Sequence, residues 1–334
     1  MAGDEEDRLT RRIVLDCDPG HDDAIAILVA AGSPEVDLVG IGTVAGNQTL
    51  DKTTRNALAV ATLAGLDVPV HAGCARPILR SLTNAASIHG ETGLDGPTPI
   101  EPDREVARGH AAHLIAEAVL ARPGETTIVA TGPLTNLALA ARLEPAIVSA
   151  TREVVVMGGA YGRGNVTPAA EFNIHVDPEA AAVVLGEPWP VTMIGLDVTH
   201  QALCSAATRR RIAGLGSTVG DFVAALLDYY AGTNRRRSGM PDPPVHDVCT
   251  IAYLAAPGLF ETRPASVEVE LHGTLSAGMT VVDFDHGPDA GSGSEHGSDL
   301  APDSGSGALG PRRVATSIDS PGFWALVVEA LARL

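Results

Sequence analysis

Four aspartates lie close together near the N-terminus, in the stretch DCDPGHDD. Asp16 and Asp18 directly follow an apolar run that is typical of a buried strand. Asp22 and Asp23 follow the Pro-Gly turn, where a helix is expected to begin. Carboxylates this close repel one another unless a cation binds them, and oxygen ligands favour a hard ion, Ca²⁺ or Mg²⁺. Helix capping would explain the second pair but not the first, so we predict a metal site.

A second polar segment lies near the middle of the chain. Asn165, Glu171 and Asn173 occupy a stretch that is expected to be non-helical, just before Asp177-Pro178 opens a helix. Amide and carboxylate groups together donate and accept hydrogen bonds, which suits a ligand with several hydroxyl groups. The alternative is a loop whose Asn side chains bond their own backbone. On this segment alone both interpretations stay open.

Three other predicted strands end in residues that a ligand can reach. Asn47 follows one apolar run, Thr131 follows a second, and Met157 ends a third before two glycines. Glycines at such a point let a ligand approach the backbone closely. A single Asn or a Thr-Gly pair is common in turns, so these residues are candidates only through their position.

Two histidines complete the set of candidates. His246 and Asp247 precede an apolar run of helical character, and His89 lies in the glycine-rich stretch HGETGLDG. An aspartate at that point can cap a helix, and a lone histidine more often has no catalytic role. The glycine-rich stretch is a candidate for a loop that moves over a site.

Short apolar runs alternate with longer helical patterns along most of the chain, and this order has to position the candidate residues. The alternation predicts a single-domain α/β fold of Rossmann-like type, with a mostly parallel central sheet flanked by helices. Ligands of such folds bind at the carboxyl ends of the strands. The expected strands are Ile13–Leu15, Leu38–Val44, Thr127–Ala130, Glu153–Met157, Val191–Leu196 and Val314–Ile318, and the expected helices include Asp23–Ala31, Leu50–Leu63, Leu134–Arg142, Pro178–Leu185, Val248–Leu254 and Pro321–Leu334.

The composition excludes several classes of protein. A net charge of −18 and an aromatic content of 3% argue against a nucleic-acid-binding surface. The chain has no uninterrupted apolar stretch of about 18 residues, and its charged first residues do not have the pattern of a signal peptide. The four cysteines form no C-x-x-C pair, so neither a zinc site nor a disulfide framework is expected. We therefore expect a cytoplasmic protein that binds neither nucleic acid nor membrane.

The 334 residues allow one large domain or roughly two of ~150 residues. We expect a single domain over residues 12–334, preceded by a disordered N-terminus at residues 1–11. Residues 284–310 include twelve Gly or Ser, five acidic residues and no Lys or Arg, which predicts a flexible surface insertion.

Taken together, these segments resemble the inosine–uridine-preferring nucleoside hydrolase family. The resemblance runs from about Arg12 to Leu334. It rests on D-x-D-P-G-x-D-D at 16–23, V-A-G-N at 44–47, G-N-x-x-x-x-A-E-F-N at 164–173 and H-D at 246–247, in that order and at matching spacing.

The resemblance implies hydrolysis of the N-glycosidic bond of ribonucleosides to ribose and free base, with one bound Ca²⁺. By this analogy, carboxylates of Asp18, Asp23 and Asp247 and the carbonyl of Thr131 would ligate the ion. Asp18 would also be the general base for a calcium-bound water, and Asp16 would support the metal site. Family members are usually homo-oligomers, so a dimer or tetramer is expected.

The same analogy assigns the substrate contacts. His246 would donate a proton to the leaving base, and His89 would touch the base. The residues expected to bind the substrate are Asp22, Asn47, His89, Met157, Asn165, Glu171 and Asn173, most of them through the ribose hydroxyls.

The chain departs from the family in the segment before His246, where members commonly carry tyrosines near the base. Tyr229 and Tyr230 are present, but the later positions are Asn234 and Ser238. The sequence therefore leaves the preference for purine or pyrimidine open.

Two alternatives were considered beside nucleoside hydrolysis. The first is a Mg²⁺-dependent phosphatase of the haloacid-dehalogenase type, which also begins with a strand followed by D-x-D. The second is a calcium-dependent ribonucleoside-binding protein without turnover. Pro19-Gly20 after the D-x-D pair argues against the first, and the presence of Asp18 and His246 argues against the second.

Overall fold

A computed structural model describes residues 10–240, 242–285 and 309–334. Residues 1–9 of the predicted N-terminal segment and most of the predicted insertion at 284–310 lie outside this part of the chain. Arg11, which the sequence analysis placed in the N-terminal segment, is the first residue of a strand and pairs with Val36.

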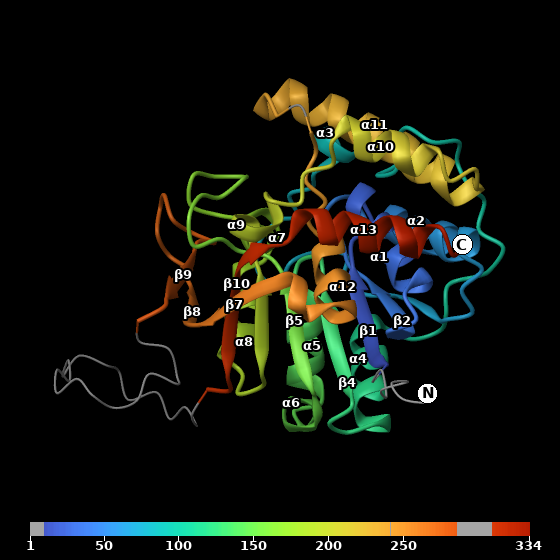
Figure 1. Ribbon diagram of the computed structural model, residues 1–334. Coiled ribbons are helices and arrows are strands. Elements are labelled where there is room, and N and C mark those ends of the chain that lie inside the picture. The colour runs from blue at the N-terminus through green and yellow to red at the C-terminus, as the bar shows by residue number, and fades with distance from the viewer. Residues whose placement is uncertain (1–9, 241, 286–308) are drawn as a thin grey trace, which may run out of the picture.

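A mostly parallel sheet forms the centre of the molecule, as the sequence predicted (Figure 1). In the described residues it has eight strands in the order β3-β2-β1-β4-β5-β6-β10-β7, and only the β10–β7 pair is antiparallel. The strands are β1 (Arg11–Cys17), β2 (Val36–Thr43), β3 (Val70–Ala72), β4 (Thr126–Ala130), β5 (Glu153–Met157), β6 (Val191–Ile194), β7 (Phe260–Pro264) and β10 (Arg312–Ile318). A separate antiparallel pair consists of β8 (Ser266–Val269) and β9 (Thr280–Asp283).

Helices cover both faces of this sheet (Figure 1). Side chains of β1 alternate between the two faces, so that Ile13 and Leu15 belong to one apolar core and Val14 to the other. Helices whose apolar residues belong to the first core are α1 (His21–Gly32), α2 (Leu50–Leu63), α11 (Thr218–Ser238), α12 (Val248–Ala255) and α13 (Ser320–Leu331). Those of the second core are α4 (Ala111–Ala121), α5 (Thr135–Leu143), α6 (Ala146–Ala150) and α8 (Pro178–Gly186).

The remaining helices have eight residues or fewer, and most lie near the carboxyl ends of the strands. α10 and α11 lie over the end of the sheet opposite α6 (Figure 1). Because α6 immediately precedes the start of β5, that opposite end is where the strands finish. The other short elements are α3 (Ala86–His89), α7 (Phe172–Val176), α9 (Leu196–Thr199), α10 (Ala206–Ala213) and the 3₁₀ turn η1 (Pro257–Leu259).

The predicted elements agree closely with those observed. The predicted helix Leu50–Leu63 and the predicted strand Glu153–Met157 match α2 and β5 residue for residue. The first helix starts at His21, two residues before its expected start. The reason is that the carbonyl of Gly20 already accepts the first helical hydrogen bond, which the N–H of Ala24 donates. No helix in the described ranges is long and apolar enough to cross a membrane.

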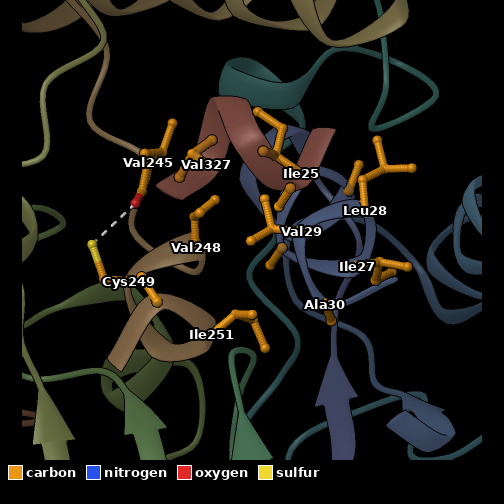
Figure 2. Close-up of a cluster of buried hydrophobic side chains, with 14 of the residues drawn as sticks. Ile25, Ile27, Leu28, Val29, Ala30, Val245, Val248, Cys249, Ile251 and Val327 are labelled. Atoms are coloured by element: carbon orange, nitrogen blue, oxygen red, sulfur yellow. Dashed lines mark hydrogen bonds between the residues drawn. The ribbon is translucent and has the colours of Figure 1, made fainter. Parts of the chain in front are cut away.

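Helix α1 is central to the first core and is almost completely enclosed. Eleven of its twelve residues are buried, which is expected of a helix that is apolar nearly all round. Figure 2 shows Ile25 and Val29 of α1 facing Val248 of α12 and Val327 of α13. The polar residues of α1 are confined to its first turn, so this packing holds Asp22 and Asp23 at the carboxyl edge of the sheet.

Helix α1 approaches α13 closely at Gly32. A Cβ at Gly32, the last residue of α1, would lie 2.1 Å from the carbonyl oxygen of Ala330. We expect Gly32→Ala to destabilise the protein by about 1–3 kcal/mol, the usual cost of overpacking. Gly186, the last residue of α8, has no atom within 4 Å of its Cβ position, so Gly186→Ala is the matched control. Urea unfolding followed by circular dichroism measures both; equal midpoints for the two variants would contradict the prediction.

Candidate active site

The predicted site residues gather around one cavity of about 270 Å³. They come from segments far apart in the sequence: the ends of β1, β2, β4 and β5, helix α3, the loop before α7 with α7 itself, and the start of α12. Ten of the predicted residues line the cavity: Asp22, Asn47, His89, Thr131, Met157, Asn165, Glu171, Asn173, His246 and Asp247. Asp18 and Asp23 lie beneath this lining and are fully buried.

Three carboxylates form the floor of the site. One oxygen from each of Asp22, Asp23 and Asp247 lies within 4.8 Å of the others, and all three residues are buried. Burial, and then the neighbouring charge of Asp22, raise the pKa of Asp247 well above its usual range. In the described part of the chain no Lys or Arg forms an ion pair with these carboxylates. Such a group is stable in ionised form only with a cation.

Asp18 lies beside this floor with one oxygen unused. Its Oδ2 accepts a hydrogen bond of 2.6 Å from the backbone N–H of Asn47, whereas its buried Oδ1 has no partner. Burial, and then the charge of Asp23, raise the pKa of Asp18. An unpartnered buried carboxylate oxygen next to three more carboxylates fits a hard cation with oxygen ligands.

Glycines allow the strand ends to close around Asp18. A Cβ at Gly46 would lie 2.1 Å from Oδ2 of Asp18, and one at Gly132 would lie 2.8 Å from its Oδ1. A Cβ at Gly20 would lie 2.6 Å from the Nδ1 of His89. Only residues without a side chain fit these three positions as the chain is folded, so the glycines of the motifs set how closely the segments approach.

Asp23 both caps its own helix and joins three strand ends. Its Oδ2 accepts from the N–H of Gly20 at 3.1 Å, which is the capping role considered from the sequence. The same carboxylate accepts from the side chains of Asn47 at 3.0 Å and Thr131 at 2.9 Å. Capping and site formation are therefore combined in one residue.

Glu171 and Asn173 organise the opposite wall. The stretch expected to be non-helical ends in the short helix α7, so Asn173 is helical, contrary to the prediction. The reason is that Glu171 caps α7 by accepting from the backbone N–H of Asn173 and Ile174. The Nδ2 of Asn173 donates to the carbonyl of Thr131 at 2.7 Å and to that of Met157 at 3.1 Å. Asn165 accepts from Phe172 N within its own loop and also lines the cavity.

Histidines and a tyrosine line the remaining side. The rings of His21, His89 and Tyr230 stack on one another, with centroids 5.2 to 5.6 Å apart. The Nδ1 of His246 lies 2.7 Å from the Oγ1 of Thr199. Burial, and then His200, lower the pKa of His246 to about 3, so the ring is neutral.

Sequence reasoning missed several of these residues. Thr199 and His200 lie within four residues of the end of the predicted strand Val191–Leu196, so the rule that ligands bind at strand ends pointed towards them. Arg237 and Met240 also line the cavity, and no sequence pattern pointed to either. Tyr230, which agrees with the family pattern, and Asn234, which departs from it, both line the cavity.

Asp16 lies apart from the three-carboxylate floor. Its Oδ1 accepts from the Nδ2 of Asn136 at 2.8 Å, and its Oδ2 has no partner. Burial raises the pKa of Asp16 to about 7. Asn136 also donates to the carbonyl of Thr43 and accepts from the N–H of Cys74, so Asp16 takes part in joining β1 to the ends of β2 and β3.

Comparisons with known proteins agree with this geometry. The family model described as "Inosine-uridine preferring nucleoside hydrolase" matches residues 13–325. An inosine-uridine preferring nucleoside hydrolase of Leishmania major is 43% identical over 98% of this chain and 99% of its own. A pyrimidine-specific ribonucleoside hydrolase RihB of Escherichia coli is also 43% identical, over 96% of this chain and 97% of its own.

Solved structures show the same fold. A plant nucleoside hydrolase superposes with a TM-score of 0.88 at 30% identity, over 97% of this chain and 99% of its own. A purine-preferring ribonucleoside hydrolase from Gardnerella vaginalis superposes with a TM-score of 0.86 at 30% identity, over 96% and 98%. With the family model spanning nearly the whole chain, the protein belongs to the inosine-uridine preferring nucleoside hydrolase family and is a ribonucleoside hydrolase, an N-glycosidase.

Proposed function

We propose that this hydrolase works with one Ca²⁺ at the carboxylate floor, held by Asp18, Asp23 and Asp247 and by the carbonyl of Thr131. The observation that carries this proposal is the buried Oδ1 of Asp18, which has no partner and lies beside the cluster of carboxylates. Oxygen donors without thiolate or imidazole favour such a hard ion. When bound, the ion supplies a water of lowered pKa and an anchor for ribose hydroxyls.

Asp18 is the proposed general base. Its Oδ2 accepts from the N–H of Asn47, which fixes the orientation of a carboxylate that is proposed both to ligate the ion and to take a proton from the attacking water. The water's oxygen bonds to the anomeric carbon while the bond from that carbon to the base nitrogen breaks, with its electron pair leaving on the base. Carboxylates around this carbon stabilise the oxocarbenium character of the transition state.

The ribose is oriented by the polar wall of the cavity. The proposed contacts are Asp22, Asn47, Asn165, Glu171 and Asn173, with Met157 beneath them. Most of these side chains are already bonded to backbone groups, which keeps them in place before the substrate binds. A preorganised wall converts binding energy into orientation at the reacting carbon.

The leaving base is placed on the histidine side. His89 lines the cavity next to Tyr230, and His246 is the proposed proton donor. A neutral imidazole carries a single N–H. When the Thr199 hydroxyl donates to Nδ1 of His246, that hydrogen is on Nε2 and is available to the base.

Neither alternative drawn from the sequence finds support. A ribonucleoside hydrolase family that covers nearly the whole chain excludes a haloacid-dehalogenase phosphatase and argues against binding without turnover. The named relatives differ in base preference, since one is pyrimidine-specific and another purine-preferring. We therefore propose common ribonucleosides as substrates, and a panel of inosine, adenosine, guanosine, uridine and cytidine would rank them.

The oligomeric state, a homodimer or homotetramer, remains a prediction that sedimentation analysis would test.

Calcium should stabilise the folded protein, because it offsets the repulsion among buried carboxylates. At ~100 times its Kd the ion should add about 2.7 kcal/mol to the free energy of unfolding. The protein is first treated with a chelator, and calorimetry with and without added Ca²⁺ then measures the stabilisation as a rise in Tm. Asp247→Asn should remove most of it, whereas Glu117→Gln, at an exposed position of α4, should keep it. A shift of the same size in both variants would place the ion elsewhere.

Asp18→Asn should lower kcat by about 10²–10⁴-fold, the range that general base catalysis contributes. The amide keeps an oxygen for the N–H of Asn47, so the fold should be retained. A reducing-sugar assay on the ribonucleoside panel measures release of ribose, and circular dichroism checks the fold. Activity similar to wild type would remove Asp18 from the role of base.

His246→Ala should reduce turnover of purine ribonucleosides more than that of pyrimidine ribonucleosides. Loss of a general acid costs about 10²–10⁴-fold where departure of the base needs a proton. The ratio of kcat/KM for inosine to that for uridine, compared with wild type, is the measurement. An unchanged ratio would argue against a purine-specific acid.

A further inference from the structure

Thr280 of β9 holds the loop that carries the ribose-binding residues, although it is not one of the residues that line the cavity. We infer that Thr280 is a positioning residue for the carboxylate of Glu171. This inference rests on the proposed role of Glu171 as a ribose contact. The β8–β9 pair lies beyond the β7–β10 end of the sheet (Figure 1), so nothing in its place in the fold suggests a link to catalysis.

The hydroxyl of Thr280 is bonded twice to one residue. Its Oγ1 donates to the carbonyl of Ala160 at 2.7 Å and accepts from the N–H of Ala160 at 2.8 Å. Both residues are buried, with 1% and 3% of their surfaces exposed. Because one hydroxyl satisfies a buried backbone donor and a buried backbone acceptor, its removal leaves both unpaired.

The residues on either side of Ala160 are hydrogen-bonded to α9. The carbonyl of Gly159 accepts from the N–H of Leu196 at 2.9 Å. The N–H of Tyr161 donates to the Oδ2 of Asp197 at 2.8 Å. Residues 159–161, in the turn after β5, are therefore held by β9 and α9.

The one group of this turn that bonds to the site is the N–H of Gly159, which donates to the Oε2 of Glu171 at 3.0 Å. Gly159 has φ of +76°, a left-handed conformation that favours glycine. A Cβ there would lie 2.8 Å from the Oγ1 of Thr280. The turn is thus confined between Thr280 on one side and Glu171 on the other.

A carboxylate held by three backbone N–H groups has a defined orientation, and one of the three depends on this turn. If the hydrogen bonds between Thr280 and Ala160 are lost, Gly159 shifts and the carboxylate of Glu171 loses one of its three backbone donors. A misplacement of ~1 Å at a substrate-orienting group can cost ~10²-fold in rate. Thr280 therefore sets the precision of the ribose contact without touching the substrate.

The test compares Thr280→Val, which keeps the shape and removes both hydrogen bonds, with Thr280→Ser, which keeps both bonds. We expect Thr280→Val to lower kcat/KM for the best ribonucleoside by about 10- to 100-fold. Thr280→Ser should stay close to wild type. Equal losses in the two variants, or no loss in Thr280→Val, would overturn the inference. If Thr280→Val does not fold, Thr280→Cys replaces it, because a thiol bonds only weakly at similar size.

A double-mutant cycle with Glu171→Gln separates positioning from a general loss of stability. If Thr280 acts through Glu171, Thr280→Val should cost little more in the Glu171→Gln background, so the two losses do not multiply. Losses that multiply fully would mean that Thr280 acts elsewhere and would overturn the inference. Turnover by the wild-type enzyme tests the proposed function separately, because every variant is measured relative to it.

Discussion

The mutual repulsion of buried carboxylates is the constraint on which this structure depends. Asp18, Asp22, Asp23 and Asp247 are all withdrawn from water, and burial raises the pKa of each. Backbone and side-chain donors from the neighbouring strand ends meet only part of the resulting cost. The part of this desolvation cost that no hydrogen bond offsets favours binding of a cation at the site. A comparable cluster on the surface would be screened by water and would bind an ion far more weakly.

Packing of the apolar core keeps these buried carboxylates in place. Helix α1 is enclosed by the apolar side chains of the first core, so its first turn cannot move away from the sheet to relieve repulsion. Parallel strands bring their carboxyl ends to one edge, where Asn47 and Thr131 supply donors to Asp23 from two sides. The packing free energy of α1 and its neighbours thus offsets electrostatic strain at the site, as is usual where function requires buried charge.

The two sides of the cavity are built differently. The wall that is proposed to bind ribose consists of side chains whose hydrogen bonds are largely satisfied by the protein itself, so it is preorganised before substrate binds. On the histidine side, the ring of His89 of α3 stacks on that of Tyr230 of α11, and Thr199 of α9 is hydrogen-bonded to His246. We therefore expect the proposed ribose wall to be common to relatives that share this fold, and the histidine side to differ with their base preference.

Much of this protein was determined by local sequence. Because hydrophobic periodicity directly reflects which faces are buried, the alternation of apolar runs and helical patterns predicted six of the eight described strands of the main sheet, but neither β3 nor β7. The motifs around Asp18, Asn165 and His246 identified many of the residues that line the site or lie beneath it, because strand ends in such a fold converge. Those parts of the structure depend on contacts between residues near one another in the chain, or on rules common to the whole fold class.

Only the tertiary structure decided the contacts between distant segments. The hydrogen bond between Thr199 and His246 joins residues 47 positions apart, and the bond from Thr280 to Ala160 joins residues 120 positions apart. That Oδ1 of Asp18 is left without a partner likewise depends on which distant segments pack around it. A threonine in a short strand looks the same in sequence whether it faces water or a catalytic loop. Its role follows from which backbone groups the fold leaves unsatisfied beside it, and that is settled only when the whole chain has packed.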